Sequence, residues 1–486
     1  MKVTDLRIPD RFERLRDLDD SALATIIVPV EAMLEAFDER FMDMRAADRG
    51  SFMVVRGQSG AGKSTFLDTV SFFREGVSTA RISRLDEVGE ALVAAAGRAP
   101  RIIVMEGREA LGEVSKQEIE AAMHEINQFV RSDVGRHSLV VWPCNTNDLT
   151  DLLVTLGKSL GGEALFGISD PVTEFQGPPK ADYLRIARQT ISALNDGASL
   201  DAIGVSAEAA ESMIPESDTI GSYLARIRRA SIRAGAQVEK LLAKERYRLW
   251  TCVIAGNDVE GDVAALTRGG AAAADIDRLI SSTGANVVSE LKQYPDKIGI
   301  LGTVLDARIA HLDMVCINAV ARTYGSPALH KAMQAQGMQI SRESSAKKRL
   351  IESDLGILLQ GNNLGTRKRG PKPGQNTKDA FMKLVAISQT NDGLLNEAIG
   401  AGLVDAGLID SFETEKTLGV DLVYHSDLYC LRAGSPLRLE MMWRAKTGRA
   451  TIANYVLGKI SNYGKAIGVL QPGGFRASQG GAAADG

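Results

Sequence analysis

The chain has 486 residues, which is enough for two to four domains of ordinary size. With 57 Lys and Arg against 61 Asp and Glu, its formal net charge is −4, and this balance excludes a protein that coats nucleic acid over its whole surface. The four cysteines form no C-x-x-C pair, the start is charged, and no apolar run approaches the thickness of a bilayer, so we expect a cytoplasmic protein with no signal peptide and no membrane partner.

The first 48 residues are expected to form a helical adaptor, and the clearest motif of the chain follows them. The short apolar run SFMVVRG (51–57) is typical of a strand, and it leads directly into GQSGAGKST. The segment KSTFLDTVSFFRE (63–75) has its apolar residues on one side of a helix. Strand, glycine loop and helix in this order provide the context that the motif G-x-x-x-x-G-K-[ST], the P-loop, requires.

The spacing of this motif has a chemical explanation. Glycines let the backbone curl with its N–H groups inward, where they and the helix N-terminus cradle phosphate oxygens. Lys63 would reach the β- and γ-phosphates, and Ser64 would offer a hydroxyl to Mg²⁺, so the expected cofactors are ATP and Mg²⁺. The residues expected to hold the nucleotide are Gly57, Gly60, Gly62, Lys63, Ser64 and Thr65.

A second buried strand, RIIVMEGRE (101–109), ends in acidic residues. In P-loop ATPases such a strand holds the metal and polarises the attacking water. Glu106 stands at the metal-side position, Gly107 at the position of the usual catalytic glutamate, and Glu109 is the nearest substitute. Gly107 favours slow hydrolysis or binding without turnover. A buried strand that simply ends in surface charge is the alternative interpretation.

An amphipathic helix then begins with an S-x-x-E capping box at Ser115 and Glu118, and HSLVVWPCNTND (137–148) reads as another buried strand with a polar end. This succession of elements resembles the AAA+ ATPase family. The resemblance implies that Asn145, or Asn147 as second choice, is the residue called sensor 1, which orients the attacking water. A simple loop cap after the strand is the alternative.

In the same family an arginine near the start of a lid helix, called sensor 2, contacts the γ-phosphate. The segment TIGSYLARIRRASIRAGAQVEKLL (219–242) reads as such a helix. Arg226 fits this role best, with Arg228 and Arg229 as neighbours, and a solvated basic helix face is the alternative. The resemblance covers roughly the first half of the chain and implies a homo-oligomer.

The following region carries a basic loop. From Arg342 to Pro373 basic residues exceed acidic ones, and TRKRGPKPGQ (366–375) is stiffened by two prolines. Such a loop can follow phosphates or lie in a minor groove of DNA, and a solvated linker is the alternative. The residues expected to contact DNA are Arg367, Lys368, Arg369 and Lys372.

The segment 376–470 reads as helix, strand, strand, strand and helix. This order is similar to the PD-(D/E)xK nuclease fold, and the resemblance implies that Asp421 and Glu440 hold Mg²⁺. Met442 stands where the family has a lysine. A structural α/β domain with charges at its strand ends is the alternative. The basic residues that could replace the lysine are Arg444 and Lys459.

The expected fold class is therefore α/β: a P-loop NTPase core of the AAA+-like kind with a helical lid, a helical middle region and a small α/β C-terminal domain. The expected boundaries are 1–48 for the adaptor, 49–175 for the core, 176–250 for the lid, 251–375 for the helical region, 376–470 for the nuclease-like domain and 471–486 for a low-complexity tail.

Three functional hypotheses follow. The leading one is an ATPase that hydrolyses ATP and is coupled to DNA or to a DNA-bound partner protein, within a multi-component bacterial system such as antiviral defence or mobile-element maintenance. The alternatives are an ATP-gated, metal-dependent DNA nuclease and a nucleotide-switched oligomeric scaffold with little turnover.

Overall fold

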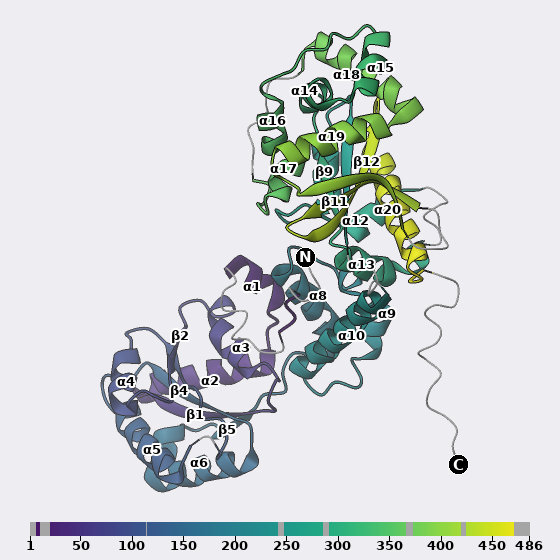
Figure 1. Ribbon diagram of the computed structural model, residues 1–486. Coiled ribbons are helices and arrows are strands. Elements are labelled where there is room, and N and C mark those ends of the chain that lie inside the picture. The colour runs from purple at the N-terminus through teal and green to yellow at the C-terminus, as the bar shows by residue number, and fades with distance from the viewer. Residues whose placement is uncertain are drawn as a thin grey trace, which may run out of the picture. The chain divides into compact units, whose positions relative to one another are not determined.

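The computed structural model describes residues 6–9, 20–112, 114–241, 247–284, 291–365, 373–418 and 424–470. The chain divides into two compact units, which are drawn in Figure 1. The first, the glycine-loop unit, comprises Ile8–Ala193 and Ala210–Arg228. The second, the mixed-sheet unit, comprises Met1–Arg7, Leu194–Ala209 and Arg229–Gly486. None of the helices in the described ranges combines the length and the apolar character that a membrane crossing requires.

The glycine-loop unit is built on a five-stranded, wholly parallel sheet with the strand order β2-β3-β4-β1-β5. The strands are β1 (Ser51–Arg56), β2 (Ser78–Ile82), β3 (Arg101–Met105), β4 (Ser138–Cys144) and β5 (Val172–Glu174). The α-helices of this part of the chain are α1 (Asp20–Ile26), α2 (Glu31–Ala47), α3 (Lys63–Thr69), α4 (Val88–Ala95), α5 (Lys116–Val130), α6 (Asn147–Leu160), α7 (Glu163–Phe166), α8 (Tyr183–Leu194), α9 (Ala207–Ser212) and α10 (Ile220–Leu241). The predicted strands at 51–57, 101–109 and 137–148 are confirmed as β1, β3 and β4.

Both faces of this sheet are buried, which explains why its central strands are continuous apolar runs. On β1, Phe52 and Val54 belong to one core, whereas Met53 and Val55 belong to the other. Helices α4, α5 and α6 cover the first face, and α2 and α3 cover the second (Figure 1). Because the strands are parallel, the loops that follow β1, β3 and β4 meet at one edge of the sheet, where α/β proteins bind their ligands.

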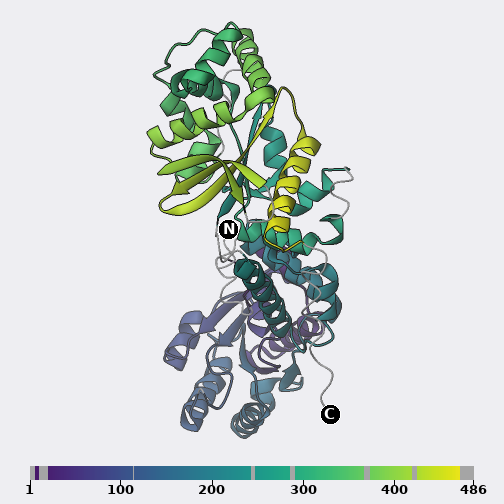
Figure 2. The same ribbon diagram turned by 45° about the vertical axis from the view of Figure 1, so that its right-hand side comes forward.

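The mixed-sheet unit contains seven strands in the order β10-β11-β12-β6-β9-β8-β7. The strands are β6 (Arg248–Ala255), β7 (Thr267–Arg268), β8 (Ala273–Ala274), β9 (Arg308–His311), β10 (Ser411–Leu418), β11 (Tyr424–Arg432) and β12 (Ser435–Arg444). The α-helices are α11 (Glu260–Leu266), α12 (Ile276–Ser281), α13 (Pro295–Val304), α14 (Met314–Tyr324), α15 (Pro327–Ala335), α16 (Ala346–Glu352), α17 (Asp354–Leu359), α18 (Gln375–Asn391), α19 (Gly393–Asp405) and α20 (Arg449–Ala466). Helices α14, α18 and α19 cover one face of the sheet, and α13 and α20 cover the other (Figure 2).

The central strand of this sheet comes from a part of the chain for which the sequence predicted helices. β6 pairs in parallel with both β12 and β9, so the stretch 251–375 and the segment 376–470 share one sheet. Trp250 and Cys252 lie in one core of the unit, whereas Leu249 and Val253 lie in the other. Burial on both faces suits the bulky and β-branched residues of this run. The α/β class is thus confirmed for both units.

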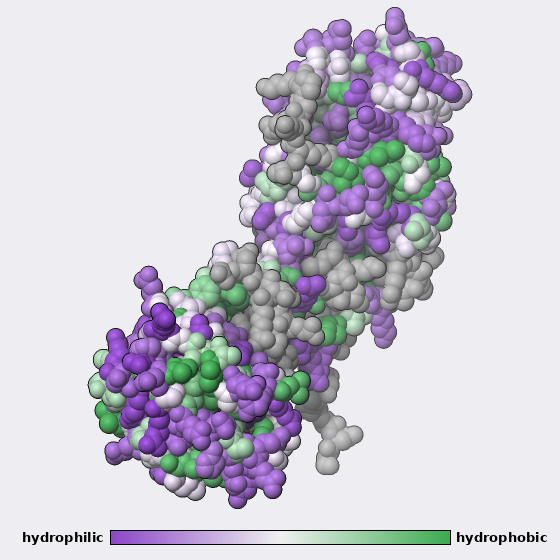
Figure 3. Space-filling view, turned by 90° about the vertical axis from the view of Figure 1, so that its left-hand side faces the viewer, coloured by the Kyte–Doolittle hydropathy of each residue, from purple (hydrophilic) through white to green (hydrophobic). Residues whose placement is uncertain are grey.

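On the face shown in Figure 3, hydrophilic residues predominate and apolar residues form small groups between them. Large exposed apolar side chains such as Leu85, Ile168 and Ile232 are distributed over separate elements. Isolated apolar residues of this kind are ordinary for a protein surface and indicate no particular partner.

Candidate functional site

The glycine-rich loop connects β1 to α3 at the carboxyl edge of the parallel sheet. Gly60 and Gly62 have φ angles of +81° and +101°, a backbone region that glycine adopts without strain. A Cβ atom on Gly57 would lie 2.5 Å from the carbonyl oxygen of Phe175, so the chain passes too closely there for a side chain. The helix α3 begins at Lys63 with no side-chain cap, which leaves the N–H groups of its first turn to another acceptor.

Lys63 is buried at the base of this loop, with 7% of its surface exposed. Its ammonium Nζ donates hydrogen bonds to the carbonyl oxygens of Gly57 (2.5 Å) and Gln58 (3.0 Å) and to Asn145 Oδ1 (2.8 Å). All three acceptors are neutral. Burial lowers the pKa of Lys63, and the negative charge of Glu109 opposes that shift.

Asn145 contacts this lysine, and Glu109 lies near enough for its charge to affect the lysine, because of the order of the strands. β4 lies between β1 and β3, so the residue that follows β4 is next to the glycine loop. The backbone N–H of Asn145 donates to the carbonyl oxygen of Glu109 at 2.8 Å, which ties the two loops together. The Glu109 carboxylate accepts a hydrogen bond from the backbone N–H of Gly107 at 3.2 Å. Three of the five predicted catalytic residues, Lys63, Glu109 and Asn145, therefore lie together beside the glycine loop.

These three residues line a pocket of about 490 Å³, within the range of small-molecule sites. All of its lining residues belong to the glycine-loop unit. Ser64 and Thr65, predicted to hold metal and nucleotide, are half-buried on its wall at the first turn of α3. Of the six residues predicted to hold the nucleotide, all except Gly57 therefore line this one pocket.

The individual residues in the rest of the pocket wall were not predicted, although two of its three parts belong to the expected lid, 176–250. One part is the segment Ile26–Val30 between α1 and α2, and a second part is the face of α8 that carries Ile186 and Thr190. The start of α10 forms a third part, where the N–H of Gly221 donates to the carbonyl oxygen of Gly60 at 2.9 Å. These segments lie far apart in the sequence, and their apolar residues give no local signal that separates a pocket wall from a core.

Glu106 is not among the residues that line the pocket. Its carboxylate accepts a hydrogen bond from Arg81 at 2.9 Å. Arg81 also binds Asp68 at 2.6 Å and donates to the carbonyl oxygen of Ser64 at 3.2 Å. Arg81, on β2, thus holds Glu106 next to α3. The same arginine contacts both Glu106 and the backbone of Ser64, the predicted metal ligand.

Arg226, the predicted sensor 2, also lies outside the pocket lining. Its guanidinium binds the Glu216 carboxylate at 2.7 Å and the Glu216 carbonyl oxygen at 2.8 Å, and it is largely exposed. Its neighbour Arg228 donates to the carbonyl oxygen of Ile8 at 3.2 Å. The structure places Leu224 and Ala225 of the same helix on the pocket wall instead.

A second cluster of charged groups is buried in the mixed-sheet unit. Glu440 on β12 is fully buried and accepts hydrogen bonds from Lys459 and Tyr463, one turn apart on α20. Asp427 on β11 lies beside it and accepts a 2.5 Å hydrogen bond from the N–H of Met441. Burial and the negative charge of Glu440 raise the pKa of Asp427 to about 7. For Lys459, the two carboxylates outweigh the effect of burial and raise the pKa.

Asp427 was missed by the sequence analysis although a signal for it existed. Ala433 and Gly434 both have positive φ, as in the two-residue turns that close hairpins. The turn sets the register of β11 and β12, which pairs Leu428 with Leu439 and continues to place Asp427 next to Glu440. Within the described residues, no group of three or more His, Cys, Asp or Glu side chains is arranged to hold a metal ion.

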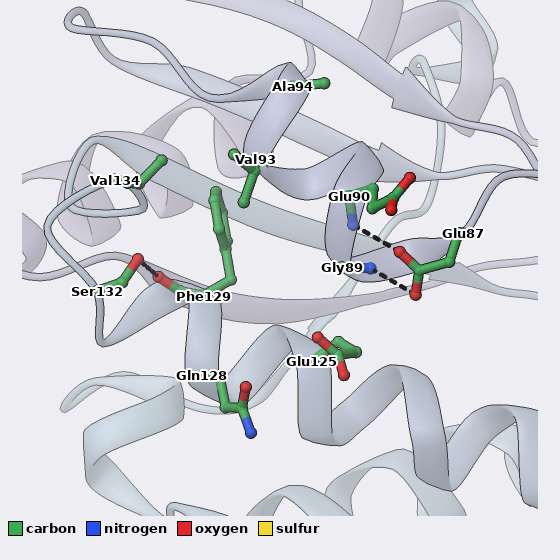
Figure 4. Close-up of a pocket in the computed structure, with 10 residues that line it drawn as sticks. All are labelled: Glu87, Gly89, Glu90, Val93, Ala94, Glu125, Gln128, Phe129, Ser132 and Val134. Atoms are coloured by element: carbon green, nitrogen blue, oxygen red, sulfur yellow. Dashed lines mark hydrogen bonds between the residues drawn. The ribbon is translucent and has the colours of Figure 1, made fainter.

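A larger hollow, of about 730 Å³, lies between α4 and α5 (Figure 4). Apolar side chains such as Val93 and Phe129 line it together with the carboxylates of Glu87, Glu90 and Glu125. The Glu87 carboxylate caps α4 by accepting hydrogen bonds from the N–H groups of Gly89 and Glu90. The dashed lines in Figure 4 show this cap, so one of the three carboxylates in the hollow has a structural role.

Some predicted residues lie outside the described ranges: Asp421, Arg367, Lys368, Arg369 and Lys372. No protein-family model matches the sequence, and no curated protein matches it.

Proposed function

We propose that the glycine-loop unit binds ATP and hydrolyses it, as the resemblance to AAA+ ATPases implies. The observation that carries the proposal is Lys63, a buried ammonium whose three hydrogen-bond partners are neutral oxygens. A buried charge without a bonded counter-ion is costly, and a bound phosphate would supply one. The pocket around it also contains a carboxylate and an amide, the groups that position and activate a water for phosphoryl transfer.

Each residue around Lys63 has a role in this proposal. The loop N–H groups and Lys63 bind the phosphates, Asn145 orients the attacking water, and Glu109 accepts its proton in place of the glutamate that Gly107 replaces. Ser64 and Glu106 are the residues that would hold Mg²⁺, which when bound offsets the phosphate charge. Arg81 competes for Glu106, because it already binds that carboxylate. Slow turnover is therefore expected.

We also propose that ATP hydrolysis is coupled to DNA or to a DNA-bound partner protein. The chain is further proposed to form a homo-oligomer. The DNA part rests on the basic run in 366–372, and the oligomer rests on the family resemblance. Neutralising Arg367, Lys368 and Arg369 together should weaken DNA binding and lower its salt dependence, because each phosphate contact releases counter-ions. Unchanged DNA affinity would remove the basic loop from the proposal.

The central test is ATP binding and steady-state hydrolysis by the full chain and by Lys63→Ala, with and without single-stranded and duplex DNA. The Lys63 variant is expected to lose turnover and at least tenfold in ATP affinity, because a charge-assisted phosphate contact is removed. Lys158→Ala, which removes an exposed lysine on α6, is the matched control and should behave as the unaltered protein. Failure of the unaltered protein to bind ATP overturns the proposal, and tight binding without turnover favours the scaffold hypothesis.

A second function, a metal-dependent DNA nuclease, is favoured by the pairing of Asp427 with Glu440 beside Lys459. Two carboxylates and a lysine are the groups that the resemblance to PD-(D/E)xK nucleases leads one to expect. In this protein the aspartate, Asp427, lies on β11. The lysine, Lys459, lies on the helix α20 instead of on the strand that carries Glu440.

Cleavage of supercoiled and linear DNA in Mg²⁺ or Mn²⁺ tests this second function. The informative variant is Asp427→Asn, because Asp427 is only partly buried and its charge is already disfavoured in the fold. If the cluster is a nuclease centre, the variant should lose cleavage while unfolding at the same or a higher temperature. Cleavage that persists in the variant excludes this centre.

A further inference from the structure

The hollow between α4 and α5 keeps its apolar and its acidic side chains apart (Figure 4). Val93, Phe129 and Val134 lie together at one end of it. Val93 and Val134 are 57% and 48% exposed, although both are apolar. Covering them would remove apolar surface from water, which is favourable. This end of the hollow therefore offers apolar surface to a partner.

Three carboxylates, those of Glu87, Glu90 and Glu125, gather at the other end (Figure 4). A Cβ atom on Gly89 would lie 2.5 Å from Glu125 Oε2 and 3.6 Å from Glu87 Oε2, so these two carboxylates converge on one point of the backbone. None of the three forms an ion pair with another described residue, and no described Lys, Arg or His lines the hollow. Like charges held close together repel, so a positively charged partner would stabilise this end.

A surface of the opposite character lies on α10. The residues Arg229, Ile232, Arg233, Ala236 and Lys240 are all exposed. Their positions, three, four, seven and eleven residues after the first, place them on one face of the helix, which we call the α10 stripe. From Arg229 onwards, α10 belongs to the mixed-sheet unit, so the whole stripe lies on one unit.

The α10 stripe combines positive charge with an exposed apolar side chain. Arg229, Arg233 and Lys240 form no ion pair with another described residue. Glu239, the only acidic residue from Arg229 to the end of the helix, is half-buried and lies outside the stripe. An exposed isoleucine alone is ordinary, but Ile232 is 58% exposed and is flanked by the two arginines. The stripe thus carries both groups that would complement the hollow.

We propose that the α4–α5 hollow of one copy of the chain binds the α10 stripe of a second copy. Ile232 enters the apolar end beside Val93 and Val134, and the two arginines of the stripe bind the carboxylates at the other end. The inference rests on the homo-oligomer of the proposed function and names the surfaces that form it. Because the two surfaces differ, the contact is head-to-tail, and the copies close into a ring or continue as a filament.

The apolar part of this contact favours a protein over DNA as the partner of the stripe. DNA phosphates would pair with the arginines but would leave Ile232 uncovered, and the acidic hollow would repel DNA. A second copy covers apolar side chains on both surfaces and also pairs the charges. Opposite charges across an interface fix its orientation and speed its formation. Self-association should therefore weaken as the salt concentration rises.

Charge reversal tests the pairing of the two surfaces. The stripe-reversed variant carries Arg229→Glu and Arg233→Glu, and the hollow-reversed variant carries Glu90→Arg and Glu125→Arg. Glu87 is kept, because it caps α4. Sedimentation velocity of the full chain over a range of concentrations, with and without ATP, measures self-association. We expect each variant to associate at least tenfold more weakly than the unaltered protein, because like charges then face each other.

An equimolar mixture of the two reversed variants supplies the decisive comparison. In the mixture, each reversed surface meets a reversed surface of opposite charge, and each unaltered surface meets its unaltered partner. Association should return to within about threefold of the unaltered protein. Glu120→Arg on α5 is the matched control, because Glu120 does not line the hollow, and it should associate as the unaltered protein does. Thermal unfolding confirms that each variant is folded.

The outcomes separate this inference from the function on which it rests. Unchanged association of both reversed variants, or folded variants that their mixture does not rescue, overturns this interface and leaves the homo-oligomer standing. Loss of DNA binding by a stripe-reversed variant that still associates assigns the stripe to DNA and also overturns it. An unaltered protein that is monomeric at every concentration, with and without ATP, overturns the homo-oligomer too. ATP binding is measured separately by calorimetry, since none of the changed residues lines the pocket around Lys63.

Discussion

Each unit contains a lysine that is largely withdrawn from solvent, buried in the case of Lys63 and half-buried in the case of Lys459, and the two lysines are held in opposite ways. Lys63 in the glycine-loop unit is bonded to two carbonyl oxygens and an amide oxygen, and its pKa is lowered. Lys459 in the mixed-sheet unit is bonded to the Glu440 carboxylate, and its pKa is raised. The first site can gain an anion, whereas the second already contains its counter-charge.

This difference distinguishes a candidate binding site at Lys63 from an ion pair that already has its counter-charge at Lys459. Neutral acceptors can be exchanged for a phosphate with a net gain in electrostatic energy, because the ammonium lacks a bonded carboxylate. Replacing Glu440 as the partner of Lys459 would first require breaking a buried pair. We therefore rank nucleotide binding above metal-dependent cleavage, and four experiments test that ranking.

The largest expected effect is on stability. Lys459→Met should lower the free energy of unfolding by about 3 kcal/mol, because the buried Glu440 carboxylate keeps its hydrogen bond from Tyr463 but loses its positively charged partner. Lys63→Met should change it by less than about 1 kcal/mol, since no bonded carboxylate is left behind. Urea unfolding of both variants measures the difference. Equal losses would show that the two lysines are not held differently.

The next effect is on turnover. Glu109→Gln should reduce ATP hydrolysis about 100-fold and leave ATP affinity within about threefold, because a general base acts in the chemical step. Steady-state kinetics and equilibrium binding separate the two quantities. Glu120→Gln on α5, a half-exposed glutamate paired with Lys116, serves as the control. Full activity of Glu109→Gln would assign the base elsewhere.

A smaller effect concerns pH. The pKa of Asp427 is raised to about 7 in the folded protein by burial and by the Glu440 carboxylate, with Asp392 adding to the shift and Lys459 opposing it. The folded state therefore binds more protons than the unfolded state between about pH 4 and pH 7, and stability contributed by this group is lost as pH rises through that window. Asp427→Asn should remove a slope of at most about 1.4 kcal/mol per pH unit. Identical pH profiles of the two proteins would contradict the placement of Asp427.

The smallest effect is expected at Arg226. Its ion pair with Glu216 is exposed, so Arg226→Ala should cost less than about 1 kcal/mol in stability. Because Arg226 does not line the pocket, ATP affinity and turnover should stay within about twofold of the unaltered protein. A tenfold fall in turnover would instead support the sensor 2 role that the family resemblance implies.

Local sequence patterns were sufficient to predict the glycine-loop side of the candidate site. The run from Ser51 to Thr65 forms a strand, a glycine loop and a helix because each step depends on neighbouring residues: apolar strand formers, glycines at positive φ and a helical stripe. The strand that precedes Asn145 was predicted for the same reason, as was the capping box at Ser115 that starts α5. Hydrophobic periodicity and turn chemistry act over a few residues, so a single sequence contains them.

Only the tertiary structure decided which distant residues complete each site. It brought the segment Ile26–Val30 and Thr190 to the pocket, paired Glu106 with Arg81, and inserted β6 between β12 and β9. These contacts join residues that are separated by tens to hundreds of positions, and apolar or charged side chains do not encode their partners locally. Burial from both faces and the strand order of the sheet determine those partners, and both are properties of the whole packed unit.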